Sequence, residues 1–323
     1  MTAMIAGGVD CDLHPAVPHL TSLLPYLNDY WRDQVTTRGM VDLVSQSYPA
    51  NSPITSRPDW RPSKGKPGSS LADMQAQVLD RFKVSYGICN PLYGVQMVFS
   101  EDMQDAFCRA LNDWLVKEWL DKDERLRGSI VIPTQSVEKS VAEIERCAAD
   151  KRFVQVLMLV MGDMPLGKRA YWPIYAAAQK HGLPIGVHAG SNYHNPPTSV
   201  GWGSYHSEDY VAQAAAFQTQ LTSLIVEGVF ARHPGLKMVM LESGFNLAAV
   251  LPLAAAQVLA RHPHGNPLGE PCPAQNCAEQ YPVFVAAGRR PAGSRDVKSP
   301  VGPYAVGRIA PILDRLSALA IRG

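Results

Sequence analysis

The chain has few cysteines, no long apolar run and almost no net charge. Its six cysteines are scattered without a Cys-x-x-Cys pair, which excludes a dense disulfide framework and favours reduced thiols. No uninterrupted apolar run reaches the roughly 18 residues of a membrane span, and the first residues lack a basic segment followed by an apolar one. We therefore expect a cytoplasmic protein with no membrane partner.

Basic and acidic residues are nearly balanced. There are 30 Lys and Arg residues against 29 Asp and Glu residues, a net charge of +1, so the composition predicts no basic surface for nucleic acid. The 323 residues, 46% of them hydrophobic, supply a large core. This length suits one α/β barrel of roughly 250 residues with an appendage.

The last part of the chain differs in composition from the rest. Residues 261–323 carry eight Lys and Arg against four Asp and Glu, whereas residues 1–260 have a net charge of −3. The same tail holds 9 of the 26 prolines. This composition indicates that residues 261–323 form a different kind of segment from residues 1–260.

Before about residue 250, short apolar runs alternate with helical patterns, which predicts βα units around a parallel sheet. The largest departure from this alternation is 48–70, a Pro-, Ser-, Lys- and Gly-rich insertion expected beside an active-site mouth. A closed barrel needs eight strands, and after residue 250 only 281–287 resembles one. Strands are predicted at 5–13, 84–89, 126–132, 153–160, 184–188 and 236–241, and helices at 102–120, 137–149 and 171–180.

The first predicted strand ends in VDCDLHP, which contains Asp10, Asp12 and His14. Alternation along a strand places these side chains on one face, and at the carboxyl end of a barrel strand that face looks into the site. Asp12 and His14 would offer one oxygen and one nitrogen to Zn²⁺ or Mn²⁺. The alternative is a capped loop with solvated carboxylates.

A second candidate ligand is His188, which ends the apolar run of LPIGVHAG and precedes small residues. Alone it could equally be a core histidine bonded to a carbonyl group. Two histidines and the Asp12 carboxylate at strand ends are together typical of a catalytic metal site with one position open. Such a site predicts a small-molecule substrate.

These motifs, with YWPIY and SLIVEGVFARHPGLKMVMLESGF, resemble the amidohydrolase-related metal-dependent hydrolases, which include aminocarboxymuconate-semialdehyde decarboxylase. The resemblance implies a TIM-like (β/α)8 barrel over residues 1–253, with Asp12, His14 and His188 holding one divalent metal, Zn²⁺ before Mn²⁺. It also implies a homodimer.

Where decarboxylase-type members of that family have a catalytic histidine, this chain has Glu242-Ser243-Gly244. Glu242 could act as a general base, or it could be a structural carboxylate. The difference favours a hydrolase over a non-oxidative decarboxylase, which remains the alternative. His206, in the loop after the fifth strand, and Trp31, near the first loop, are candidate substrate contacts.

The aspartate that the family places after strand eight is missing. Asp296 and Asp314 are the only aspartates after residue 253, and neither follows an apolar strand. One choice of codons for 254–269, read one base out of phase, gives WRLHKYWRGIRMEIPW, close to the helix expected there. We therefore predict a frameshift near Leu253, which would leave strands seven and eight missing or replaced by the tail 254–323. The alternatives are a divergent C-terminus and a catalytically impaired barrel.

Overall fold

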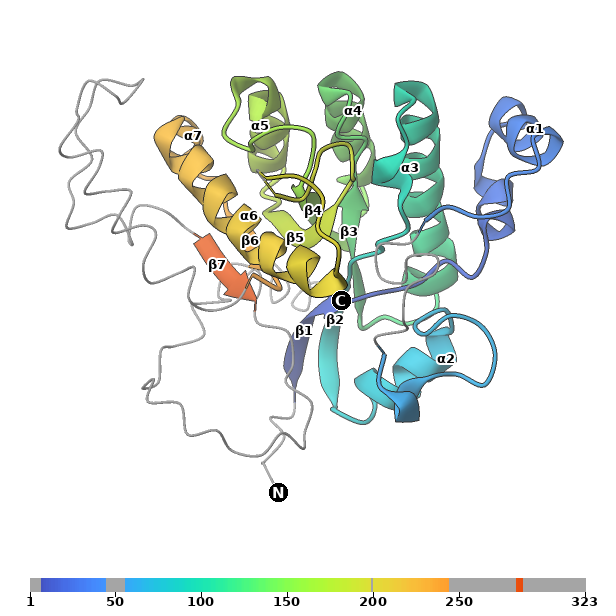
Figure 1. The fold of residues 1–323 in the computed structure, drawn as a ribbon. Coiled ribbons are helices and arrows are strands. Elements are labelled where there is room, and N and C mark those ends of the chain that lie inside the picture. The colour runs from blue at the N-terminus through green and yellow to red at the C-terminus, as the bar shows by residue number, and fades with distance from the viewer. Residues whose placement is uncertain (1–6, 45–55, 199, 244–282, 287–323) are drawn as a thin grey trace.

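A computed structural model of the chain describes residues 7–44, 56–198, 200–243 and 283–286. Its strands are parallel and lie in one sheet in the order of the sequence, from β1 to β7 (Figure 1). The strands are β1 (Gly8–Leu13), β2 (Val84–Cys89), β3 (Leu126–Val131), β4 (Phe153–Met161), β5 (Ile185–Ser191), β6 (Met238–Leu241) and β7 (Val283–Ala286).

Helices connect successive strands from β1 to β6, as βα units require. Figure 1 shows α3, α4 and α5 side by side along the sheet. The helices are η1 (Leu20–Tyr26), α1 (Asp29–Thr37), η2 (Pro58–Trp60), α2 (Leu71–Met74), η3 (Gln75–Leu79), η4 (Val95–Met97), α3 (Glu101–Leu115), η5 (Val116–Leu120), α4 (Val137–Cys147), η6 (Arg169–Tyr171), α5 (Trp172–Lys180), α6 (His206–Val226) and α7 (Val229–Arg232).

Local sequence explains where the central elements begin. Ser100 and Ser136 precede α3 and α4, and each hydroxyl accepts a hydrogen bond from a backbone N–H in the first turn. In β4 eight of nine residues are buried, as expected for a parallel strand covered on both faces. The side chains of Trp114 and Trp119 are buried in the main hydrophobic core.

The predicted α/β class and the first six strands are confirmed. The largest boundary difference is in β5, which continues past His188 to Ser191 because β4 keeps pairing with it as far as Met161. The strand predicted at 281–287 is present as β7 and pairs with β6. The rest of the tail, including Asp296 and Asp314, lies outside the described residues, so the frameshift stays a prediction.

The described part of the 48–70 insertion lies against the segment after β1. The backbone N–H of Ala16 donates to the carbonyl oxygen of Gly68 at 3.0 Å. Four cysteines lie in described segments, and all four are free thiols. Among the described helices, none has the length and apolar character that a membrane crossing requires.

Candidate metal centre

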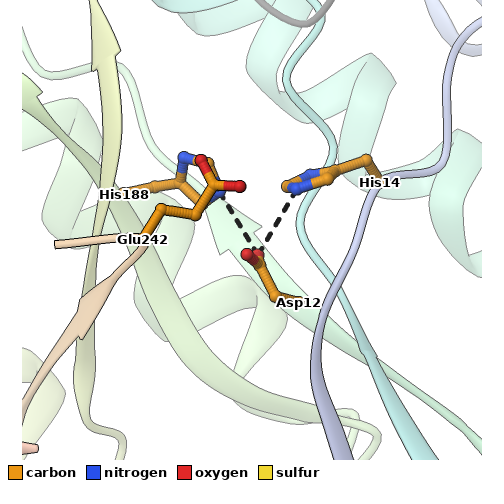
Figure 2. A group of neighbouring side chains, drawn as sticks. All are labelled: Asp12, His14, His188 and Glu242. Carbon is orange, nitrogen blue, oxygen red and sulfur yellow. Dashed lines mark ion pairs between the residues drawn. The ribbon is translucent and has the colours of Figure 1, made fainter. Parts of the chain in front are cut away.

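Four side chains converge at the carboxyl ends of three strands (Figure 2). Asp12 lies on β1, His14 follows β1, His188 lies on β5 and Glu242 follows β6. Each of them offers a ligand atom within 4.8 Å of those of the other three. The shortest distances join Asp12 Oδ1 to His188 Nε2 (3.2 Å) and to His14 Nε2 (3.5 Å). The structure thus brings Glu242 together with the three predicted ligands.

The curvature of the sheet creates this cluster. Three strands separate β1 from β5, so a flat sheet would hold the two about 19 Å apart at the usual spacing of about 4.8 Å per strand. The 3.2 Å contact between Asp12 and His188 across that interval requires the sheet to curl around its carboxyl ends. The described strands therefore form the curved wall of a barrel, with the site inside it.

Both histidines are oriented by backbone carbonyl groups. The Nδ1 atom of His14 lies 3.0 Å from the Asn90 carbonyl oxygen, and Nδ1 of His188 lies 2.6 Å from that of Ala189. A carbonyl oxygen only accepts, so each Nδ1 carries the hydrogen. In the neutral rings Nε2 is then the atom with a free lone pair, as in metal-binding histidines whose other nitrogen is held by a carbonyl group.

Asn90 contacts the cluster, and sequence reasoning missed it. It is fully buried directly after β2, and its Nδ2 donates to Asp12 Oδ1 at 2.8 Å and to the Cys11 carbonyl at 3.1 Å. Its own Oδ1 accepts from Ser129 Oγ (2.6 Å) and Gln155 Nε2 (2.9 Å). A polar residue following the apolar run of a strand was the available signal, the same one that identified His188.

Asp12 and His14 have shifted pKa values because of the charges around them. Burial opposes ionisation of Asp12, but the neighbouring imidazoles of His14 and His188 outweigh it and hold the pKa of Asp12 well below its usual value. Burial likewise acts to lower the pKa of His14, yet the Asp12 carboxylate raises it to about 9. In the absence of a metal the site therefore favours one carboxylate beside one imidazolium, and a cation would take the place of that proton.

The donor set fits a divalent metal ion. The Nε2 atom of His188 is buried and makes no hydrogen bond, although Asp12 and Glu242 lie 3.2 Å and 3.9 Å from it. A tetrahedral ion with bonds of about 2.0–2.1 Å places its ligands roughly 3.3–3.4 Å apart. The 3.2 Å separation of Asp12 and His188 is close to that spacing, whereas the 3.9 Å separation of Glu242 and His188 is longer. Imidazole with carboxylate suits Zn²⁺ or Mn²⁺.

Glu242 is held at the mouth of the site by a strained backbone. Its φ of 61° lies in the left-handed region, which costs a residue with a Cβ about 1–2 kcal/mol. Strain of this kind is concentrated at functional sites. The side chain is 46% exposed, against 2% for His188, so Glu242 is the member of the cluster most open to solvent and substrate.

The two predicted substrate contacts, Trp31 and His206, belong to helices α1 and α6. Trp31 lies in α1, where it packs edge to face on Tyr30 and partly against the core. His206 begins α6, so its predicted place in a loop is wrong. Glu208 starts the helix there by accepting backbone hydrogen bonds from Ser204 and Tyr205, both at 2.7 Å. Contact of Trp31 and His206 with a substrate stays a prediction.

Comparison with known proteins identifies the family. The amidohydrolase family matches residues 9–264, so the chain belongs to it. A solved amidohydrolase from Mycobacterium avium subsp. paratuberculosis K-10 superimposes with a TM-score of 0.64 and 19% identity over 88% of this chain and 83% of that one. This likeness confirms the TIM-like barrel fold.

Two decarboxylases are also similar. Gamma-resorcylate decarboxylase from Rhodococcus jostii is 24% identical over 56% of this chain, which spans only 58% of that relative's length. A dihydroxybenzoic acid decarboxylase from Polaromonas sp. JS666, solved with manganese and the inhibitor 2-nitroresorcinol, superimposes with a TM-score of 0.52 and 15% identity, over 88% of this chain and 79% of that chain.

Proposed function

We propose that this protein is a metal-dependent, non-oxidative decarboxylase of a small hydroxylated aromatic carboxylic acid. The observation that carries the proposal is the cluster of Asp12, His14, His188 and Glu242 inside the barrel wall. The similar decarboxylases support this activity over the hydrolysis that the sequence favoured.

Asp12, His14 and His188 would hold the metal. A bound divalent cation acts as a Lewis acid that withdraws electron density from substrate oxygens and balances their charge. The two Nδ1 hydrogen bonds to backbone carbonyls keep both imidazoles aimed at one point, and Asn90 holds Asp12 beside them. These residues therefore supply a prepared site rather than one assembled by the substrate.

The reaction needs one proton and no oxidant. The bond between the ring and the carboxylate breaks, its electron pair stays on the ring carbon, and carbon dioxide leaves while that carbon takes up a proton. Glu242 is the carboxyl group open to the mouth of the site, so we assign the transfer of this proton to it.

The position of Glu242 also favours a second candidate, hydrolysis of an ester or lactone. A carboxylate that delivers a proton to carbon can equally take one from an attacking water molecule. The two candidates differ in their products, so one substrate panel separates them.

The test incubates the purified chain with 2,6-dihydroxybenzoate and either Zn²⁺ or Mn²⁺, and measures carbon dioxide and 1,3-dihydroxybenzene. We expect both products in equal amounts, and their loss in His188→Ala. His181→Ala is the matched control, because His181 pairs with Glu145 outside the cluster. Turnover of esters or lactones without release of carbon dioxide would replace the decarboxylase by the hydrolase. No turnover of either class would contradict both.

A further inference from the structure

We propose that Gly68, near the end of the 48–70 insertion, is a positioning residue for His14. The inference rests on the proposed metal centre, because His14 matters only as a ligand of that centre. Gly68 lies in the left-handed region with φ of 76°, and its backbone touches the backbone of the segment that carries His14. The insertion would thus hold the backbone of His14, the candidate ligand that follows β1, in its position.

The contact leaves no room for a side chain. A Cβ atom on Gly68 would lie 2.6 Å from the carbonyl oxygen of His14, against at least 3.4 Å for an ordinary contact. One of the two backbones would therefore have to move by about 0.8 Å, the shortfall between these distances. Because the atom in the way is backbone oxygen, a change of side-chain rotamer cannot relieve the clash.

The described part of the insertion is tied in place at Gly68 and at Lys66, so it resists moving away. The carbonyl oxygen of Gly68 accepts from the N–H of Ala16 at 3.0 Å. Lys66 donates to the carbonyl oxygen of Val17 at 3.4 Å and to Asp42 Oδ2 at 2.7 Å. With the insertion anchored in this way, a residue larger than glycine would displace the His14 backbone.

Displacement of that backbone would misdirect the ligand atom. The His14 ring is fixed at Nδ1 by the Asn90 carbonyl, so a shift of the main chain tilts the ring about this hydrogen bond and moves Nε2 away from Asp12. Binding constellations tolerate errors of only about 0.5 Å. Loss of a group that orients a metal ligand typically lowers metal affinity about 10–100-fold.

The experiment compares Gly68→Ala with Gly65→Ala. Gly65 has φ of 85° in the same insertion, but a Cβ there meets only the Ser69 hydroxyl, at 3.3 Å. Both variants place alanine in a left-handed conformation, but only the Cβ of Gly68→Ala would clash with the His14 carbonyl oxygen. Zinc affinity is measured by competition with a chromophoric chelator, and Co²⁺ absorption reports the ligand set.

We expect zinc to bind Gly68→Ala about 10–100-fold more weakly than Gly65→Ala, with an altered Co²⁺ spectrum only in Gly68→Ala. Equal zinc affinities and identical Co²⁺ spectra in the two folded variants would overturn the proposal. If the wild-type chain binds zinc no better than His188→Ala, the proposed metal centre itself is wrong. That result differs from equal zinc affinities of the two glycine variants, which would contradict only the role of Gly68.

A second pair of variants covers the case in which Gly68→Ala does not fold. Lys66→Ala keeps the glycine but removes the contacts with Val17 and Asp42, and Lys64→Ala changes an exposed lysine two residues away. We expect zinc affinity to fall about tenfold in Lys66→Ala alone, by the same loss of ligand orientation. Equal affinities in this pair would then overturn the proposal.

Discussion

Replacing Asn90 by alanine should weaken the fold and the metal centre together. The change removes the donor that holds Asp12 Oδ1 at 2.8 Å and the acceptor of the Ser129 hydroxyl and the Gln155 amide. It also leaves the Cys11 carbonyl without this donor. Asp12 would keep its histidine neighbours but lose the contact that fixes its orientation.

The magnitude follows from the groups left without a partner. The Ser129 hydroxyl and the Cys11 carbonyl lose their Asn90 partner, whereas Gln155 keeps a hydrogen bond to Ser129 at 2.8 Å. Each buried polar group left unpaired costs about 1–3 kcal/mol, so the loss of both partners should lower the free energy of unfolding by about 2–6 kcal/mol. Metal affinity should fall about 10–100-fold, as for other residues that orient ligands.

Asn112→Ala is the matched control. Asn112 is equally buried and bonds both backbone groups of Val131 and the carboxylate of Glu143, none of which belongs to the four-residue cluster. The assays are urea unfolding and zinc competition. We expect both variants to lose stability and only Asn90→Ala to lose zinc affinity. The reasoning is refuted if Asn90→Ala binds zinc as well as Asn112→Ala does.

Two further predictions concern strain and pH. Glu242→Gly removes a residue with a Cβ from the left-handed region, so stability should change by no more than about 1 kcal/mol while zinc affinity and turnover fall. Hydrogen bonds from Arg125 outweigh burial and lower the pKa of Asp123 to about 2. Because the folded pKa lies below the unfolded value, this contribution, about 2 kcal/mol, is present above pH 4 and lost between about pH 4 and pH 2. The stability difference between wild type and Asp123→Asn should shrink over that interval.

Chemical denaturation and zinc titration check the first prediction, and denaturation at several pH values checks the second. A Glu242→Gly variant with wild-type turnover would remove Glu242 from the proposed proton transfer. For Asp123, the control is Asp29→Asn, which changes an aspartate whose side chain is 98% exposed. A stability difference for Asp123→Asn that stays constant down to pH 2 would contradict the assigned pKa.

The strands and the clustering of the three candidate ligands could be predicted because each depends on local pattern. Continuous apolar runs mark buried parallel strands, and polar residues at the ends of those runs mark the open edge of a barrel. Asp12, His14 and His188 all follow that rule. The sequence also located β7, from the apolar run at 281–287.

Other features depend on contacts between distant segments. His194 is one example, because Asp163, 31 residues away in sequence, accepts from its Nδ1 at 2.5 Å and its side chain is only 8% exposed. Asn90 lies 78 residues from Asp12 in sequence, and the strained φ of Glu242 is a property of three-dimensional placement. Neither hydrophobic periodicity nor motif spacing in the sequence predicts these two sets of contacts or this backbone angle.

The C-terminal predictions remain to be tested. Most of the segment 254–323 lies outside the described residues, so the frameshift near Leu253 is checked by sequencing the coding DNA. An uninterrupted reading frame that matches closely related genes to its end would contradict it. The homodimer also stays a prediction, which light scattering on the purified chain would check.

The metal content of the purified chain tests the central claim most directly. After reconstitution with Zn²⁺ or Mn²⁺ and removal of free metal, elemental analysis should find about one equivalent per chain, and less than about a tenth of an equivalent in His188→Ala. His181→Ala should retain the full amount. A wild-type chain that holds less than about a tenth of an equivalent, or a His188→Ala variant that holds as much metal as wild type, would contradict the account.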